Sequence, residues 1–187
     1  MSSKSTNILK PVNHLSASEE KWFAVYTKYK CEKYVVTQLS KKGVSAYLPL
    51  TTVTKKYVSK VKRYQVPLIN CYVFVKIKKA EYVSVLETEY VMGFIKQRQS
   101  LISIPNKEID TLRLVVGEIE NVEAGNVELQ CGDEVEIISG NLTGIKGKLV
   151  EKEGSNRFVV DLLTVGMQLS MTIDRNLMRL EKKAALS

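Results

Sequence analysis

The sequence predicts two folded parts: an α+β N-terminal domain, in which helices flank an antiparallel sheet, and a small all-β barrel at the C-terminus. The run Tyr72–Val75 (YVFV), inside Cys71–Ile77, is aromatic and β-branched, which favours a buried central strand. Basic residues are concentrated just before this run. From Gly132 onward the chain changes to short strand-like runs separated by glycines, which is typical of a small barrel.

The charge is unevenly distributed. The chain has 187 residues, is 44% apolar and carries a formal net charge of +8, so it can bury one medium core or two small ones. Residues 21–80 hold fourteen basic residues and one acid, whereas residues 81–130 hold four bases and nine acids. A domain this basic favours a polyanionic partner, nucleic acid first, with an ordinary basic surface as the alternative.

Several function classes are disfavoured. The three cysteines (Cys31, Cys71 and Cys131) are far apart and form no CxxC, which argues against a disulfide framework or zinc site and fits a reducing cytoplasm. The single histidine, His14, lies in a polar leader, and no glycine-rich phosphate loop occurs, so we expect no enzyme, metal or cofactor. No apolar run has the length of a membrane span, and no signal peptide is evident.

The first elements follow from local patterns. Residues 1–20 are polar and without periodicity, which predicts a mobile tail. Trp22–Tyr26 is expected to be a strand and Thr27 to cap the following helix, which would end at Gly43. The apolar face of this helix comprises Cys31, Val35, Val36 and Leu39.

A basic hairpin is expected next. A strand broken at Pro49 is predicted over Ala46–Leu50 and Thr51–Thr54. The hairpin itself is predicted over Lys55–Gln65. Its cations alternate with aromatic residues: Lys55, Lys56, Tyr57, Lys60, Lys62, Arg63 and Tyr64. Such a surface suits a sugar-phosphate backbone and base stacking, but lysines also protect edge strands against aggregation, and both interpretations stay open.

Beyond the central strand, Lys79–Thr88 has helical spacing, and Val91–Phe94 is expected to begin a strand pair that continues through Leu101–Ile104. Pro105–Val116 predicts a helix with Asn106 as its N-cap, which completes a domain over residues 21–116.

The second half predicts a linker and a barrel. Residues 117–130 are acidic with two glycines, and a flexible coil of this length spans about 20 Å. Residues 131–183 then supply the barrel domain, starting with Val135 and Ile137. Its further strands are expected at Arg157–Leu163, Gln168–Ile173 and Leu177–Leu180.

These motifs resemble a known family. The glycine-rich pattern at Gly132, Asp133, Val135, Ile137, Gly140, Gly144 and Gly147 resembles a KOW motif, which forms an SH3-like barrel. Upstream, WFAVYTKYKCEK, the PL…YVFV run and YVMGFI resemble the NusG N-terminal (NGN) domain. The order of the two, over residues 21–181, is that of NusG-family transcription elongation factors.

Within the family, Ala46–Leu50 and Val66–Leu68 look more like the specialised RfaH and UpxY-type antiterminators. Two positions depart from the family pattern. Ile69–Tyr72 (INCY) stands where Phe-Pro-Gly-Tyr or Phe-Pro-Asn-Tyr is common, and Asn141–Leu142 where Pro-Phe is common.

The resemblance implies a non-enzymatic factor that binds RNA polymerase between the clamp helices and the gate loop and suppresses pausing. The polymerase-binding residues would be Tyr26, Tyr82 and Ser84. Phe74 either lies beside Tyr26 on the polymerase-binding face or belongs to the core, and we favour the core. Tyr82 likewise lies either on that face or in the core.

Nucleic-acid and protein partners are also implied. For a non-template DNA strand we nominate Lys28, Tyr29, Lys30, Lys62 and Arg63, with a solvated basic face as the alternative. The KOW domain of the family docks ribosomal protein NusE or termination factor Rho, and we expect a monomer without a membrane partner. The candidate contacts for this docking are Asn141, Leu142, Thr143, Ile145 and Phe158.

Three functions compete. The leading hypothesis is an antiterminator of one or a few long operons, such as those for capsule or other surface polysaccharides. The alternatives are a general NusG that cooperates with Rho, and a KOW-containing RNA-binding or ribosome-associated protein. The barrel glycines favour a permanent barrel over the helical refolding known for RfaH.

Overall fold

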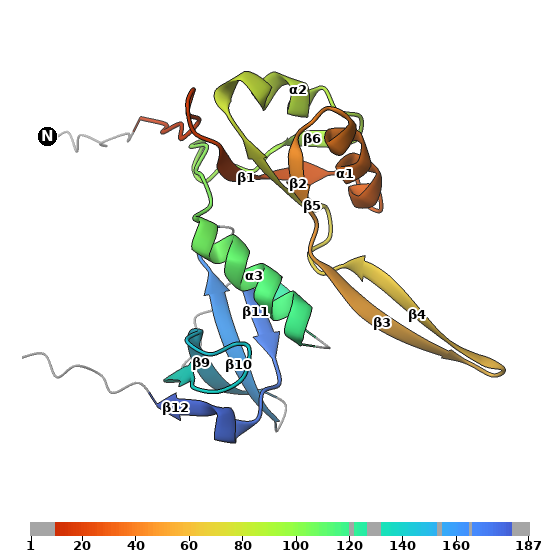
Figure 1. The fold of residues 1–187 in the computed structure, drawn as a ribbon, viewed down its shortest axis with the longest axis vertical. Coiled ribbons are helices and arrows are strands. Elements are labelled where there is room, and N and C mark those ends of the chain that lie inside the picture. Colours follow the sequence, from red (N-terminus) through yellow and green to blue (C-terminus); the bar gives the residue numbers. More distant parts are fainter. Residues whose placement is uncertain (1–9, 120–121, 127–131, 153–154, 165, 181–187) are drawn as a thin grey trace, which may run out of the picture.

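The structure is a computed structural model that describes residues 10–119, 122–126, 132–152, 155–164 and 166–180 (Figure 1). Parts of three expected segments lie outside the described residues: 1–9 of the tail, 120–121 and 127–130 of the linker, and 131, 153–154, 165 and 181–183 of the barrel domain.

A four-stranded antiparallel sheet forms the N-terminal half, with the strand order β2-β5-β1-β6. The inner strands β1 (Lys21–Thr27) and β5 (Tyr72–Ile77) pair along their length, so the expected central strand is confirmed. The outer strands are β2 (Ser45–Tyr47) and β6 (Val91–Phe94). Because residues alternate between faces along a strand, β1 and β5 each contribute to two cores.

Helices cover both faces of this sheet. Buried residues of α1 (Glu32–Lys41) and α2 (Tyr82–Leu86) share one core with Phe23 and Val75, and the short 3-10 helix η1 (Lys79–Glu81) leads into α2. On the other face, α3 (Asn106–Glu118) packs in a core that contains Trp22 and Phe74. Phe74 is fully buried, so it belongs to the core, as expected.

The basic hairpin is a long two-stranded ribbon that projects away from both sheets (Figure 1). It comprises β3 (Leu50–Tyr57) and β4 (Lys60–Pro67), which pair from Leu50↔Pro67 to Tyr57↔Lys60. Apart from its base, every residue of the ribbon is exposed, so neither face contributes to a core.

Three local expectations are wrong. Thr27 does not cap α1: its N–H donates to the Cys71 carbonyl at 2.8 Å as part of the sheet, and Cys31 takes the cap position. At α3 the N-cap is Pro105 rather than Asn106. Leu101–Ile104 forms no strand pair with β6, because Leu101 bridges to Asn13 and Ile104 to Trp22.

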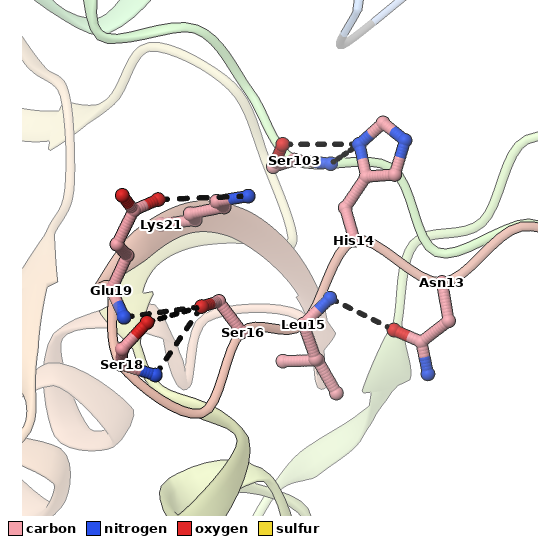
Figure 2. Close-up of polar contacts among 8 residues, drawn as sticks. All are labelled: Asn13, His14, Leu15, Ser16, Ser18, Glu19, Lys21 and Ser103. Carbon is pink, nitrogen blue, oxygen red and sulfur yellow. Dashed lines mark hydrogen bonds and ion pairs between the residues drawn. The ribbon is translucent and has the colours of Figure 1, made fainter.

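Residues 11–20 of the N-terminal segment make several contacts with the rest of the N-terminal half. Figure 2 shows His14 Nδ1 beside Ser103, at 3.2 Å from the backbone N and 3.1 Å from Oγ. Leu15 packs against the core, and the Ser16 carbonyl accepts the N–H of Lys79 at 2.8 Å. The segment thus connects the 101–104 loop to the start of η1.

The C-terminal half is a six-stranded antiparallel sheet with the order β12-β8-β9-β10-β11-β7. The strands are β7 (Glu123–Asn126), β8 (Asp133–Ile137), β9 (Lys146–Lys152), β10 (Ser155–Leu162), β11 (Met167–Met171) and β12 (Met178–Leu180); the 3-10 helix η2 (Arg175–Leu177) precedes β12. All-β structure is therefore confirmed for this half. Gly140 and Gly144 adopt positive φ angles of 82° and 87° in the turn before β9, which glycine accommodates without strain.

Helix α3 lies between the two halves (Figure 1). Arg113 stacks over the rings of Trp22 and Tyr47, with its guanidinium carbon 5.1 and 5.0 Å from their centroids. From the other half, Thr164 Oγ1 donates to Glu108 Oε1 at 2.8 Å and Asn141 Nδ2 to Glu118 Oε2 at 2.7 Å. Inside the segment expected to be a flexible linker, β7 pairs with β11.

Gly147 offers a test of the C-terminal packing. A Cβ at Gly147 would overlap the Val159 carbonyl oxygen and lie 2.8 Å from Phe158 Cζ. We expect Gly147→Ala to lower the free energy of unfolding by about 1–3 kcal/mol, measured by denaturant titration, because the strand must move to make room. The matched control is Gly117→Ala in α3, where a Cβ meets nothing within 4 Å. An equal effect of both substitutions would contradict this packing.

Candidate functional site

Tyr26 is an exposed aromatic residue at the end of β1. Alternation places it on the α3 face of the sheet with Trp22 and Ala24, but at 48% it is exposed where they are buried. It pairs with Tyr72 across the strands, and the two rings meet edge to face at 6.2 Å. A hydrogen bond with the Cys71 side chain raises the pKa of Tyr26, so the hydroxyl is neutral at physiological pH.

A buried carboxylate holds the turn beside this tyrosine pair. Glu32 is 2% exposed, and its Oε1 accepts the N–H of Cys71 at 2.8 Å. Cys71 has a φ of 64°, which a non-glycine residue keeps only when its surroundings hold it there. The one acid of the basic stretch 21–80 therefore stabilises the turn that leads into β5. Sequence reasoning missed this role, although its isolation among bases was a signal.

The nominated residues at the start of α1 form an exposed basic and aromatic patch. Lys28, Tyr29 and Lys30 are all exposed. The Lys28 ammonium lies 5.6 Å from the centroid of Tyr90, and the Lys30 ammonium lies 5.3 Å from that of Tyr29. Such contacts hold the cations beside aromatic rings that can stack on bases.

Two further tyrosines, which sequence reasoning missed, extend this patch. Tyr34 and Tyr90 meet at 5.3 Å between ring centroids, and the Tyr34 hydroxyl donates to Glu89 Oε2 at 2.7 Å. Hydrogen bonds from Tyr34 and Tyr90 lower the pKa of Glu89, while the carboxylate raises the pKa of both tyrosines. The patch thus combines lysines and neutral rings with one firmly charged acid.

The ribbon residues Lys62 and Arg63 point to opposite faces. Lys62 lies opposite Lys55 and Arg63 opposite Thr54, and residues directly opposite each other in a ladder share a face. The ribbon base lies beside α1, because Lys33 Nζ donates to the Gln65 carbonyl at 2.6 Å. The structure therefore does not place both nominated ribbon cations against a single partner strand.

The expected polymerase-binding residues do not gather on one face. Tyr82 is half-buried on the α1 and α2 side, where it stacks on Phe94 at 4.6 Å. Ser84 is also half-buried, and its carbonyl accepts the Lys42 ammonium at 2.8 Å. Because Tyr26 lies on the opposite face, it cannot share an apolar concavity with Tyr82.

The five nominated KOW residues differ in accessibility. Leu142 is buried and Ile145 half-buried in the core that includes α3, and Asn141 bonds Glu118 of that helix. Thr143 is exposed. Phe158 is fully buried inside the C-terminal sheet, so its side chain is not on the surface.

Among the described residues, no three His, Cys, Asp or Glu side chains form a group that could hold a metal ion. No helix in the described part of the chain has the length and apolarity to cross a membrane.

Comparison with known proteins assigns the family. A family model described as "Transcription termination factor nusG" matches residues 20–113, half of the chain. The chain belongs to the NusG family. This is a family of transcription factors, and the matched residues include the whole N-terminal sheet and most of α3.

A solved structure of a NusG protein supports the fold. The structure entitled "Domain interaction in Thermotoga maritima NusG" has a TM-score of 0.56 at 21% identity, covering 89% of this chain and 100% of that one. "Crystal Structure of MjSpt4:Spt5 complex conformation B" covers 87% of this chain and 97% of that one at 19% identity, but its TM-score of 0.31 is too low to indicate a shared fold. Among curated proteins, none is significantly similar in sequence. The expected fold class, a NusG-like N-terminal domain followed by an all-β KOW-like part, is confirmed.

The tyrosine–carboxylate cluster gives a prediction for NMR. Tyr34→Phe removes a hydrogen bond to the charged form of Glu89, so the pKa of this carboxyl should rise toward its ordinary value. A carbon-detected pH titration of the Glu89 side chain measures the shift. Tyr29→Phe is the control, because Tyr29 does not contribute to the lowered pKa. An unchanged pKa of Glu89 in Tyr34→Phe would refute the hydrogen bond.

Proposed function

We propose that this NusG-family protein binds RNA polymerase through its N-terminal half and acts as a transcription elongation and antitermination factor. The observation that carries the proposal is Tyr26, an exposed and uncharged aromatic residue at the end of the inner strand. Exposed aromatic residues are frequent anchors of protein interfaces. Tyr72 supports the ring from the side, which limits the conformational entropy lost on binding.

The proposed mechanism is differential binding. Tyr26 contacts the clamp helices of one large polymerase subunit, and Ser84, supported by Tyr82, contacts the gate loop of the other. The two groups lie on opposite faces of one sheet, which suits a bridge between two separate elements better than a single concavity. A bridge that is made only when the clamp is closed stabilises the closed state and so disfavours pausing.

Nucleic-acid contacts are a second part of the proposal. Lys28, Tyr29 and Lys30 would meet an exposed non-template DNA strand, and Lys62 would add phosphate contacts. Arg63, nominated together with Lys62, lies on the other face of the ribbon and would not share them. The support is the exposed cation–aromatic patch at the start of α1 and the acid-free ribbon beside it. The lowered pKa of Glu89 keeps one negative charge in the patch. Because this charge repels phosphates, the DNA backbone would lie beside the lysines and away from Glu89.

The C-terminal half would recruit a further protein, ribosomal protein NusE or termination factor Rho. We propose the division into a flexible tail at 1–20, an N-terminal domain at 21–116, a linker at 117–130 and a KOW domain at 131–183. The last residues of α3 and the strand β7, which pairs with β11, lie within the proposed linker. Of the nominated contacts, Asn141 and Thr143 are exposed, and Asn141 donates to Glu118 of α3. Leu142 and Ile145 lie in the core that includes α3. A partner that binds this loop would therefore compete with α3. Phe158 is fully buried, so it would affect such a partner only through the packing of the sheet.

We favour a specialised factor of the RfaH or UpxY type, monomeric and cytoplasmic, which serves one or a few operons. Its support is the sequence at Ala46–Leu50 and Val66–Leu68. A general NusG that cooperates with Rho is the alternative, favoured by the description of the matching family as a termination factor. A general factor would enhance Rho-dependent termination in vitro, and a specialised one would reduce it.

Transcription in vitro over a template with a defined pause site tests the proposal. We expect the purified protein to shorten the pause in proportion to its occupancy of the polymerase. A pause of unchanged lifetime at saturating protein, on templates with several pause sequences, would overturn the proposed function.

Tyr26→Ala tests the role of the exposed ring. Loss of an interface anchor costs about 1–2 kcal/mol or more, so the protein concentration that gives half the pausing effect should rise roughly tenfold. Val12→Ala, a truncation of another half-exposed apolar residue, is the matched control and should leave this concentration unchanged. Equal effects of the two substitutions would remove Tyr26 from the interface.

A further inference from the structure

The two faces of the β3–β4 ribbon differ in chemistry. Cross-strand pairs share a face, and the pairs Val53↔Tyr64, Lys55↔Lys62 and Tyr57↔Lys60 alternate with Thr52↔Gln65, Thr54↔Arg63 and Lys56↔Val61. We call the first set the tyrosine face and the second the arginine face. Both aromatic residues of the ribbon, and three of its five cations, lie on the tyrosine face.

The two rings of the tyrosine face are accessible and close enough to interact. Tyr57 is 50% and Tyr64 39% exposed. A side-chain hydrogen bond with Tyr57 raises the pKa of Tyr64, and the Lys55↔Lys62 pair lies between the two tyrosines on this face. The face therefore presents two neutral rings with cations between and beside them.

This arrangement is costly for an isolated ribbon. Lys55 and Lys62 are directly opposite each other, and like charges in that position destabilise a ladder. A two-stranded hairpin without a core is marginally stable by itself, and no acid lies anywhere in residues 50–67 to compensate the lysines. A polyanion bound on this face would relieve the repulsion. Lysines that merely protect an edge against aggregation would explain the charge but not the paired rings among them.

We infer that the tyrosine face of the ribbon binds single-stranded nucleic acid, with Tyr57 and Tyr64 stacking on unpaired bases and Lys55, Lys60 and Lys62 contacting phosphates. The inference deepens the proposed nucleic-acid contact and rests on it. It assigns Lys62 to the bound strand and Arg63, on the other face, to solvent. The rings favour a single strand over a duplex, because only unpaired bases offer their faces for stacking.

The test is a binding titration of the full-length protein by fluorescence anisotropy. The probes are a labelled oligothymidylate and an oligouridylate of about ten nucleotides, which is within the site size of single-strand binders, and a duplex of the same length. Tyr57→Ala with Tyr64→Ala should weaken single-strand binding at least about fivefold and leave duplex binding within about twofold, because stacking is lost. A loss on either the DNA or the RNA strand supports the inference and identifies the strand that is bound.

Matched charge variants separate the two faces. Lys55→Ala with Lys62→Ala and Lys56→Ala with Arg63→Ala each remove two charges, but from opposite faces. The first pair should reduce the slope of log affinity against log salt by about 1.4 on the single strand, and the second pair should change it by less than half as much. All these side chains are exposed, and circular dichroism verifies that each variant is folded.

Three results would overturn the inference. The double tyrosine variant could bind the single strand with wild-type affinity, or it could lose affinity for the duplex as much as for the single strand. The two charge-pair variants could also show equal slopes of log affinity against log salt. Weaker binding of the tyrosine variant to polymerase without nucleic acid would also overturn it, since the ribbon would then be a protein contact. Failure here leaves the pausing assay unaffected, so it is distinguishable from failure of the proposed function.

Discussion

The antiparallel ladder between β1 and β5 determines where the candidate functional side chains of the N-terminal half lie. Its register pairs Tyr26 with Tyr72 at one end and Lys21 with Ile77 at the other. Along each strand, alternate residues enter the α1–α2 core or the α3 core, and Tyr26 is the first residue on the α3 side that is left uncovered. A shift of one residue would bury this ring and expose the core.

The turn that ends the ladder depends on one buried acid. Glu32 accepts the N–H of Cys71, and the Cys71 carbonyl accepts the N–H of Thr27. These bonds hold the chain where β1, α1 and β5 meet, which is also where the exposed tyrosines gather. The single acid of the basic stretch 21–80 is therefore inside the domain, where it accepts a backbone hydrogen bond, and not among the exposed lysines.

Helix α3 connects this sheet with the C-terminal one. Its inner face shares a core with Trp22 and Phe74, and the same cluster continues through Leu142 to the C-terminal strands. The hydrogen bonds of Glu108 and Glu118 to Thr164 and Asn141 add polar contacts at the edges of that packing. The acids of residues 81–130 thus serve, in part, to hold the two halves together.

Much of the fold could be predicted from the sequence, because strand periodicity and glycine positions are local properties. The strands around Trp22–Tyr26 and Cys71–Ile77, the helix ending at Gly43 and the basic hairpin all occur as expected. The two predicted N-caps were wrong. The side chains of Thr27 and Asn106 can cap a helix, but Thr27 pairs in the sheet, and the helix that begins at Asn106 has the preceding Pro105 as its N-cap.

The site was harder to predict than the fold. Lys28 and Tyr29 could be nominated from the sequence, but their neighbours Tyr34 and Tyr90 come from separate elements and meet only through the tertiary fold. Tyr82 was grouped with Tyr26 because both are aromatic, yet alternation in the sheet places them on opposite faces. The strand β7 inside an acidic, glycine-containing stretch has no local signal and forms because β11 offers an edge.

The most direct test of the central claim, that the N-terminal sheet binds a transcribing polymerase, is association with RNA polymerase halted on a nucleic-acid scaffold. In a native gel, or by sedimentation, the purified full-length protein should move with the halted complex. A protein that remains free at concentrations well above those of the complex, while it is folded by circular dichroism, would contradict the account.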